Sequence, residues 1–206
     1  MNLIEATAFF ETNRGAVNED IWLKYGRGTF IPDQLPSEWL TLMEYYADLN
    51  AKNIIEIGTH TGGSLWYFIK HAAPGARVIS IDIDHDLCQM WSEFTTIRPD
   101  VEVIKLTGDS TDPAIIAKAR ELMPEVDFVF IDGNHFFPYS QLDWDNYGQH
   151  AKSCAMHDIG CGEYPQWPQE VRRVWNSIVE SKPGKTAELI FKDGTKAAYG
   201  IGIIER

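Results

Sequence analysis

Hydrophobic positions along the chain follow two spacings that alternate with each other. Short apolar runs, typical of buried strands, fall at residues 53–57, 77–83, 101–106, 127–132 and 154–158. Between them, apolar residues recur every three or four positions, which predicts helices at 64–71, 86–95, 113–123, 139–150 and 169–181. Alternation of this kind predicts parallel strands joined by helical crossovers, in one α/β domain.

The two ends of the chain depart from this alternation. Residues 1–36 contain one predicted short helix near 4–12 and are otherwise predicted to be irregular. We therefore expect an N-terminal extension that serves as a lid or a subunit contact, with Trp22, Tyr25 and Phe30 in it. Residues 37–206 form the predicted core, and its last strands are expected at 188–191 and 201–204, around a turn at 192–194.

Composition and charge narrow the classes of partner. The chain has 206 residues and a formal net charge of −12, without a basic run, so a nucleic-acid substrate is disfavoured. A small molecule that is neutral, cationic or held by a metal fits better. The three cysteines form no CxxC motif, and no basic leader or long apolar run is present, which predicts a cytoplasmic protein without a membrane partner.

Candidate functional residues follow the predicted strands, where open sheets of this type bind their ligands. The first strand leads into a glycine-rich turn, Gly58-Thr59-His60-Thr61-Gly62-Gly63, before a helix. Such a turn brings backbone N–H groups close to a ligand, although a plain tight turn is the alternative. Asp82 ends the second strand, where an acid can accept hydrogen bonds from a ribose. Asp109 and Ser110 follow the third strand, where they can reach an adenine.

These residues carry a resemblance to a known family. The motifs IIEIGTHTGGS, ISIDID, TGDS, FVFIDGNH and AMHDI, all within residues 53–158, resemble class I S-adenosylmethionine-dependent methyltransferases. They are most similar to small-molecule O-methyltransferases of the macrocin O-methyltransferase and cephalosporin-hydroxylase-like branch, which is related to catechol O-methyltransferase. The resemblance implies a Rossmann-like, doubly wound, mostly parallel sheet of seven strands with helices on both faces. The final GIGIIER resembles the reversed last strand of that fold.

The resemblance also implies roles for individual residues. Asp82 would hold the ribose of S-adenosylmethionine, and Asp109 and Ser110 would lie by its adenine. The methionine part and the sulfonium would be surrounded by Glu56, Gly58, Thr59, Gly62, Gly63 and Ser64. A cationic sulfonium suits an acidic site.

The later strands supply the predicted chemistry. By the same resemblance, Asp132, His157 and Asp158 would bind a divalent cation, which we expect to be magnesium, with manganese or iron as alternatives because of the imidazole. Asp132 would also take part in catalysis. His135 is the predicted general base, because Asn134 stands where macrocin-type relatives often have an acid and an amide cannot accept the proton.

The predicted reaction is transfer of a methyl group to a hydroxyl of a small-molecule acceptor. An oxidative enzyme, a non-catalytic cofactor-binding protein and a nicotinamide dehydrogenase on the same scaffold are the alternatives. Residues 160–168, with Tyr164 and Trp167, are predicted to form a loop over the site. Sugar hydroxyls, phenols and nitrogen acceptors stay open, and so does assembly into a homo-oligomer.

Overall fold

The computed structural model describes residues 1–13, 34–89, 91–160, 170–190, 192–193, 196–197 and 199–206. Its helices are α1 (Leu3–Asn13), α3 (Pro36–Leu49), α4 (Gly63–His71), α5 (Trp91–Ile97), α6 (Pro113–Leu122), α7 (Tyr139–Asn146) and α8 (Val171–Glu180). Its strands are β1 (Asn53–Ile57), β2 (Arg77–Asp82), β3 (Glu102–Thr107), β4 (Phe128–Ile131), β5 (Ser153–His157), β6 (Lys185–Leu189), β7 (Lys192–Asp193), β8 (Lys196–Ala197) and β9 (Ile201–Glu205).

Seven of these strands form the central sheet, in the order β3-β2-β1-β4-β5-β9-β6. Strands β1 to β5 pair in parallel, whereas β9 runs antiparallel to both β5 and β6. The chain winds outward from β1 to β3 and then returns to place β4 on the other side of β1. The predicted sheet of seven strands with a reversed last strand is confirmed. Its topological switch point, where the strand order reverses, lies between β1 and β4.

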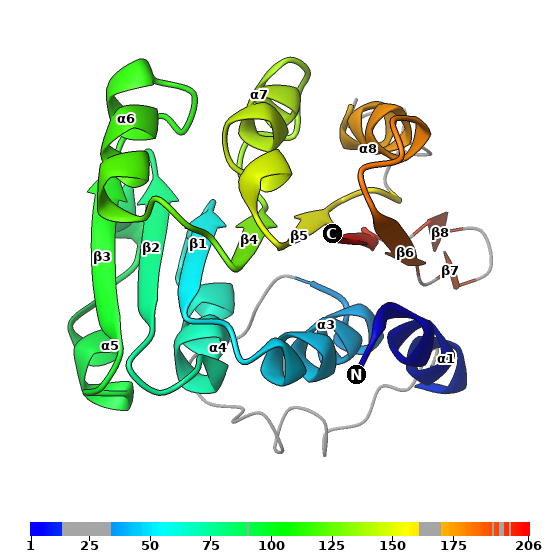
Figure 1. The fold of residues 1–206 in the computed structure, drawn as a ribbon, viewed down its shortest axis with the longest axis horizontal. Coiled ribbons are helices and arrows are strands. Elements are labelled where there is room, and N and C mark those ends of the chain that lie inside the picture. Colours follow the sequence, from blue (N-terminus) through cyan, green and yellow to red (C-terminus); the bar gives the residue numbers. More distant parts are fainter. Residues whose placement is uncertain (14–33, 90, 161–169, 191, 194–195, 198) are drawn as a thin grey trace.

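Helices cover both faces of this sheet (Figure 1). The helices α1, α3, α4 and α5 lie on one face, and α6, α7 and α8 lie on the other. Neighbouring residues of β1 point to opposite sides, so Ile54 belongs to the core under the first layer and Ile55 to the core under the second. Burial on both faces explains why β1, β2, β4 and β5 are continuous apolar runs, whereas β3, at the edge of the sheet, is partly exposed.

Two predicted helices are interrupted. The helix expected at 86–95 is a 3-10 turn, His85–Leu87, followed by α5, because the Asp84 carboxylate accepts a hydrogen bond from the backbone N–H of Asp86 and closes a separate turn. The helix expected at 139–150 ends at Asn146 and continues as a 3-10 turn, Gly148–His150. A Cβ on Gly148 would lie 2.6 Å from the ring of Trp144, so the chain packs more tightly here than a residue with a side chain would allow.

The C-terminal strands also differ from the prediction. The strand expected at 188–191 is β6, which begins at Lys185 and pairs with β9 from Lys185↔Glu205 to Leu189↔Ile201. The expected turn at 192–194 is in part a second sheet, because β7 pairs with β8. The first residues of β6 are polar, so the apolar pattern did not predict them as part of a strand. They are in the sheet because β6 pairs with β9 along its whole length.

The predicted N-terminal helix is confirmed as α1, and it is part of the core rather than an appendage. Leu3, Ala6 and Phe10 are buried, and α1 lies beside α3 and β6. Trp22, Tyr25 and Phe30 lie outside the described residues. Within the described part of the chain, none of the helices has the length and apolar character that crossing a bilayer requires.

Candidate functional site

The candidate site lies at the carboxyl edge of the sheet, around the switch point between β1 and β4. The backbone N–H of Gly58 donates to the carbonyl of Ile81, 2.9 Å away, and the N–H of Asp132 donates to the carbonyl of Ile57, 2.8 Å away. The N–H of Gly108 donates to the carbonyl of Asp82. These bonds bring the segments that follow β1, β2, β3 and β4 together at one edge.

The turn after β1 requires glycine at two positions. Gly58 has φ +88°, and a Cβ there would lie 2.0 Å from the backbone oxygen of Asp132. Gly62 has φ +90°, and a Cβ there would lie 2.7 Å from the Cys88 sulfur and the Phe94 ring. Both have a left-handed backbone conformation that side chains rarely adopt, and neither has room for a methyl group. The turn therefore packs directly on the start of the β4 loop.

Glu56 lies beneath this turn and holds it from inside the protein. The residue is fully buried, and its two carboxylate oxygens accept hydrogen bonds from the hydroxyls of Ser64, at 2.6 Å, and Thr59, at 3.1 Å. Burial raises the pKa of Glu56 to about 8, although both hydroxyls oppose this shift. The side chains of these three predicted cofactor residues therefore bind one another. Gly63 is the first residue of α4, whose N-terminus has no side-chain cap.

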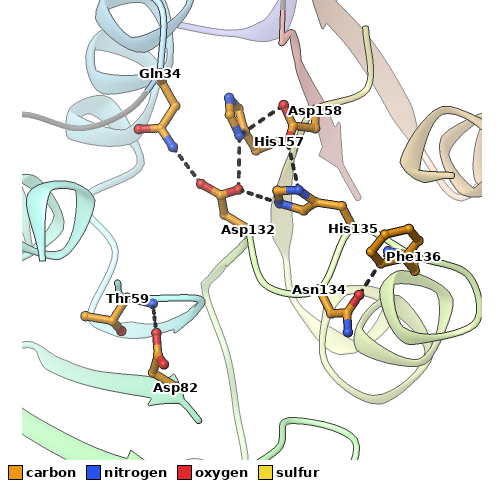
Figure 2. A network of polar contacts seen from close by, with 9 residues as sticks. All are labelled: Gln34, Thr59, Asp82, Asp132, Asn134, His135, Phe136, His157 and Asp158. Atoms are coloured by element: carbon orange, nitrogen blue, oxygen red, sulfur yellow. Dashed lines mark hydrogen bonds and ion pairs between the residues drawn. The ribbon is translucent and has the colours of Figure 1, made fainter. Parts of the chain in front are cut away.

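Asp82, at the end of β2, binds the backbone of this turn (Figure 2). One oxygen of its carboxylate accepts from the backbone N–H groups of Thr59, at 2.7 Å, and His60, at 2.8 Å. The other accepts from the backbone N–H of Asp84, at 2.8 Å. An acid held rigidly by amides at a partly exposed strand end is suited to accept further hydrogen bonds from a ligand hydroxyl.

Asp109 and Ser110 lie at the end of β3, on the same edge. Asp109 is exposed, and its carboxylate accepts from the N–H and the hydroxyl of Thr111. The Ser110 hydroxyl donates to the carboxylate of Asp143, 2.6 Å away. Asp143 comes from α7 and is fully buried. It is a residue that the sequence reasoning missed, because a single acid within a predicted helix carries no signal.

Two acids and two histidines meet beyond the switch point (Figure 2). One oxygen of Asp132 lies 3.3 Å from Nε2 of His135 and 3.0 Å from Nδ1 of His157. Asp158 lies 3.1 Å from Nδ1 of His135 and 3.6 Å from Nδ1 of His157. The sequence separately predicted a role for each of these four residues, and the structure brings all four together.

The acids of the cluster favour the charged forms of its histidines, and the histidines favour the charged form of Asp132. Burial favours the neutral form of Asp132, but the neighbouring His157 and His135 outweigh it and lower the pKa of Asp132 to about 2. Burial likewise favours a neutral His157, yet Asp132 and Asp158 raise its pKa to about 9. The pKa of His135 is also raised, because its carboxylate neighbours outweigh its burial. Asp132 is therefore a carboxylate and His157 an imidazolium at neutral pH.

A subset of this cluster can converge on one cation. Asp132, His135 and Asp158 each offer a ligand atom, and these atoms lie within 4.8 Å of one another. This set contains His135 where the sequence predicted His157. The His157 ring is buried and stacks on Tyr199, and its Nε2 has no hydrogen-bond partner among the described residues. A site of two carboxylates and one imidazole suits a divalent metal.

One further contact comes from a distant part of the sequence. Gln34 Nε2 donates to the second oxygen of Asp132, at 2.6 Å, so the segment just before α3 contributes to the cluster. No local pattern marks Gln34 for this contact, which depends on a separation of 98 residues along the chain. The predicted covering loop lies outside the described residues at 161–168.

Parts of the chain are similar to known methyltransferases. A rhamnosyl O-methyltransferase/CmcI family profile matches residues 29–144, which is more than half of the chain and includes the segments after β1 to β4. Ribosomal RNA large subunit methyltransferase E of Methanocorpusculum labreanum is 43% identical over 65 residues, which cover 31% of this chain and 31% of that protein.

Two solved structures share the fold over nearly the whole chain. The O-methyltransferase of Bacillus cereus, in complex with SAH, has a TM-score of 0.64 at 17% identity, with 100% of both chains covered. TomG of Streptomyces achromogenes, in complex with SAM, has a TM-score of 0.65 at 19% identity, with 98% of this chain and 97% of that chain covered. At this identity the likeness shows the fold alone. The extent of the profile match shows the family: the chain belongs to the rhamnosyl O-methyltransferase/CmcI family of O-methyltransferases.

Proposed function

We propose that this protein transfers a methyl group from S-adenosylmethionine to a hydroxyl of a small molecule, with assistance from a divalent metal. One observation carries the proposal. The glycine turn held by Asp82 and the cluster around Asp132 lie on the same sheet edge, and the backbone of Asp132 packs against Gly58 of that turn. A cofactor on the turn would therefore lie beside the group that activates the acceptor.

The cofactor half of the site is suited to a cationic ligand with a ribose. Asp82 presents a carboxylate that amides already orient, and Asp109 is a second, exposed acid at the end of β3. Ser110 reaches the same edge. The protein carries a net charge of −12, which favours a sulfonium over an anionic ligand. Glu56, Thr59 and Ser64 would support the turn from below.

The metal half fits a divalent cation by the chemistry of its donors. Asp132, Asp158 and His135 would hold the ion, and magnesium or manganese would suit two carboxylates with one imidazole. A bound cation of this kind lowers the pKa of an acceptor hydroxyl and orients it. His157 would hold Asp132 in place through the contact of its Nδ1 with the carboxylate.

His135 is also the candidate base, and its surroundings limit how it can act. Its Nε2 faces Asp132 and its Nδ1 faces Asp158, so a proton taken from an acceptor would be shared with one of these carboxylates. A nitrogen that binds a cation cannot accept a proton at the same time. A neutral imidazole has a single nitrogen with a free lone pair, so the two proposed roles of His135 exclude each other at any one time: bound to the ion it cannot be the base, and as the base it would leave the ion to the carboxylates of Asp132 and Asp158.

The test separates cofactor binding from metal dependence. Calorimetric titration with S-adenosylhomocysteine should show binding to the full chain, and a thermal shift should appear with this ligand and not with NAD. Methyl transfer from labelled S-adenosylmethionine is then measured on a panel of phenols and sugars, after chelation and after addition of MgCl₂ or MnCl₂. Stabilisation by NAD alone would favour a dehydrogenase. Turnover that chelation leaves unchanged would remove the metal from the proposal.

A further inference from the structure

The helix α7 and the residue that follows it hold the segment after β3 by two hydrogen bonds. The hydroxyl of Ser110 donates to Oδ1 of Asp143, at 2.6 Å, and the hydroxyl of Tyr147 donates to the backbone carbonyl of Ser110, at 2.8 Å. Asp143 has 0% of its surface exposed, whereas Ser110 is only partly buried. A buried carboxylate from the covering helix therefore binds a hydroxyl that lies on the candidate site.

Asp143 lies between two loops of the site rather than at its rim. A Cβ built on Gly133, which follows Asp132, would lie 3.6 Å from Oδ2 of Asp143. That oxygen has no hydrogen-bond partner among the described residues. Fully buried acids are rare unless they are paired, because removal from water penalises their charge. Burial raises the pKa of Asp143 to about 7, the nearby Asp109 adds to this, and the Ser110 hydroxyl opposes it.

The contact determines which hydrogen bonds Ser110 can offer to a ligand. A serine hydroxyl has one proton to donate and two lone pairs to accept with. At Ser110 the proton points to Asp143, and this direction is fixed while the carboxyl is ionised, because a carboxylate can only accept. The Ser110 oxygen is left as an acceptor. It would bind an N–H donor and would meet a carbonyl oxygen unfavourably.

We propose that Asp143 is a positioning residue that fixes the Ser110 hydroxyl as a hydrogen-bond acceptor and so makes the site selective for the 6-amino purine of its cofactor over a 6-oxo purine. This inference rests on the proposed function and on the position beside the adenine that the family resemblance implies for Ser110. Tyr147 anchors the same segment through its backbone and does not touch the hydroxyl. A Tyr147 variant is therefore a control: it loses the anchor on the loop but leaves the direction of the Ser110 hydroxyl unchanged.

The test compares two ligands that differ in one group. S-adenosylhomocysteine carries the amino group, and S-inosylhomocysteine carries an oxygen in its place. We expect the wild-type protein to prefer the amino ligand by about tenfold or more in calorimetric Kd, since a buried acceptor facing a carbonyl is unpaired. Ser110→Ala should lower this ratio at least about threefold, and Asp143→Leu should lower it by a similar factor.

Three variants should keep the ratio near the wild-type value. Ser110→Thr retains the hydroxyl, and Asp143→Asn retains a carbonyl oxygen that can accept. Tyr147→Phe removes only the backbone anchor, so it should weaken both ligands equally. Asp143→Leu in the Ser110→Ala background should change the ratio no further, because the two residues act through one hydrogen bond.

The outcomes distinguish failure of this inference from failure of the proposed function. If the wild-type protein binds S-adenosylhomocysteine but Ser110→Ala keeps the full preference, the inference is overturned and the proposed function stands. If the wild-type protein binds neither ligand, the proposed function falls and the inference with it. Should Asp143→Leu fail to fold by circular dichroism, the pair Ser110→Ala and Ser110→Thr decides, because Ser110 is only partly buried.

Discussion

The two halves of the site hold their central carboxylates by different means. Asp82 is bound by three backbone N–H groups, from Thr59, His60 and Asp84. Asp132 is bound by three side chains, from Gln34, His135 and His157. Amides in a fixed turn cannot rotate away from the acid that they bind, whereas side chains can change rotamer. The proposed cofactor half is therefore held more rigidly, and the proposed metal half can rearrange around a ligand.

This difference has a consequence for the way substitutions act. Damage to the amide-held half should affect the turn itself and therefore protein stability. Damage to the half held by side chains should affect ligand binding with less effect on the fold. Four predictions test this division, from the largest expected effect to the smallest.

Gly58→Ala should affect both halves, because the new Cβ would meet the backbone of Asp132 at 2.0 Å and the residue has φ +88°. We expect a loss of about 4 kcal/mol in the free energy of unfolding, measured with urea. Gly75→Ala is the matched control, since Gly75 has φ +70° but no atom within 4 Å of a new Cβ. It should lose only about 1 kcal/mol. Equal losses in the two variants would show that the turn does not press on the β4 loop.

Glu56 should make stability depend on pH. Its pKa is raised from 4.5 to about 8 in the folded protein, so folding takes up a proton between these values and stability falls as pH rises through this window. We expect a loss on the order of 3 kcal/mol between about pH 5 and pH 8 from this residue. Urea unfolding at several pH values measures the slope.

Glu56→Gln should reduce that slope by the share of Glu56, because an amide does not titrate. Glu121→Gln, at an exposed position on α6 paired with Lys118, is the control and should keep the wild-type slope. A Glu56→Gln protein with the wild-type slope would mean that Glu56 does not hold its proton in the folded state.

Asp82→Ala should remove the acceptor from three backbone N–H groups at once. We expect a loss of about 2 kcal/mol in the free energy of unfolding and a Kd for S-adenosylhomocysteine at least about tenfold weaker. The Kd for Mn²⁺ should change by less than about twofold, because the metal half does not use this carboxylate. If the affinity for manganese fell as far as the affinity for the cofactor, the two halves of the site would not be independent.

Asp132→Asn should have the opposite profile and the smallest effect on the fold. The Kd for Mn²⁺, measured by calorimetry, should weaken about tenfold because a charged ligand is lost, and the Kd for S-adenosylhomocysteine should stay within about twofold. Asp112→Asn is the control, since Asp112 caps α6 on the same sheet edge and asparagine caps equally well. Unchanged manganese binding in Asp132→Asn would exclude Asp132 as a ligand.

The confirmed parts of the fold are those that depend on local patterns. The apolar runs predicted β1 to β5 within one or two residues; β1, β2, β4 and β5 are buried on both faces and so are mainly apolar, whereas the edge strand β3 is partly exposed and keeps only an alternating apolar pattern. The strand β6 was misplaced because it begins with the polar residues Lys185 and Thr186. The helix expected at 139–150 was too long because its end depends on packing between Gly148 and Trp144 rather than on a local breaker.

The site follows the same rule. Glycines at 58 and 62 and an acid at 82 follow from a short turn and a strand end, and the sequence alone placed them on one edge. Gly58 and Gly62 obey the local geometry of one turn, and Asp82, on the next strand, follows from the rule that ligand sites of parallel sheets lie at the carboxyl ends of the strands.

The sequence by itself determined the alternation of strands and helices, the glycine turn and the identity of the acids and histidines at the strand ends. Only the tertiary structure decided which of these side chains meet. It placed both His135 and His157 against Asp132 and Asp158, and it brought in Asp143 and Gln34, which no motif marked. The reason is physical: partners from separate elements depend on how the helices pack on the sheet and on which rotamers the core allows.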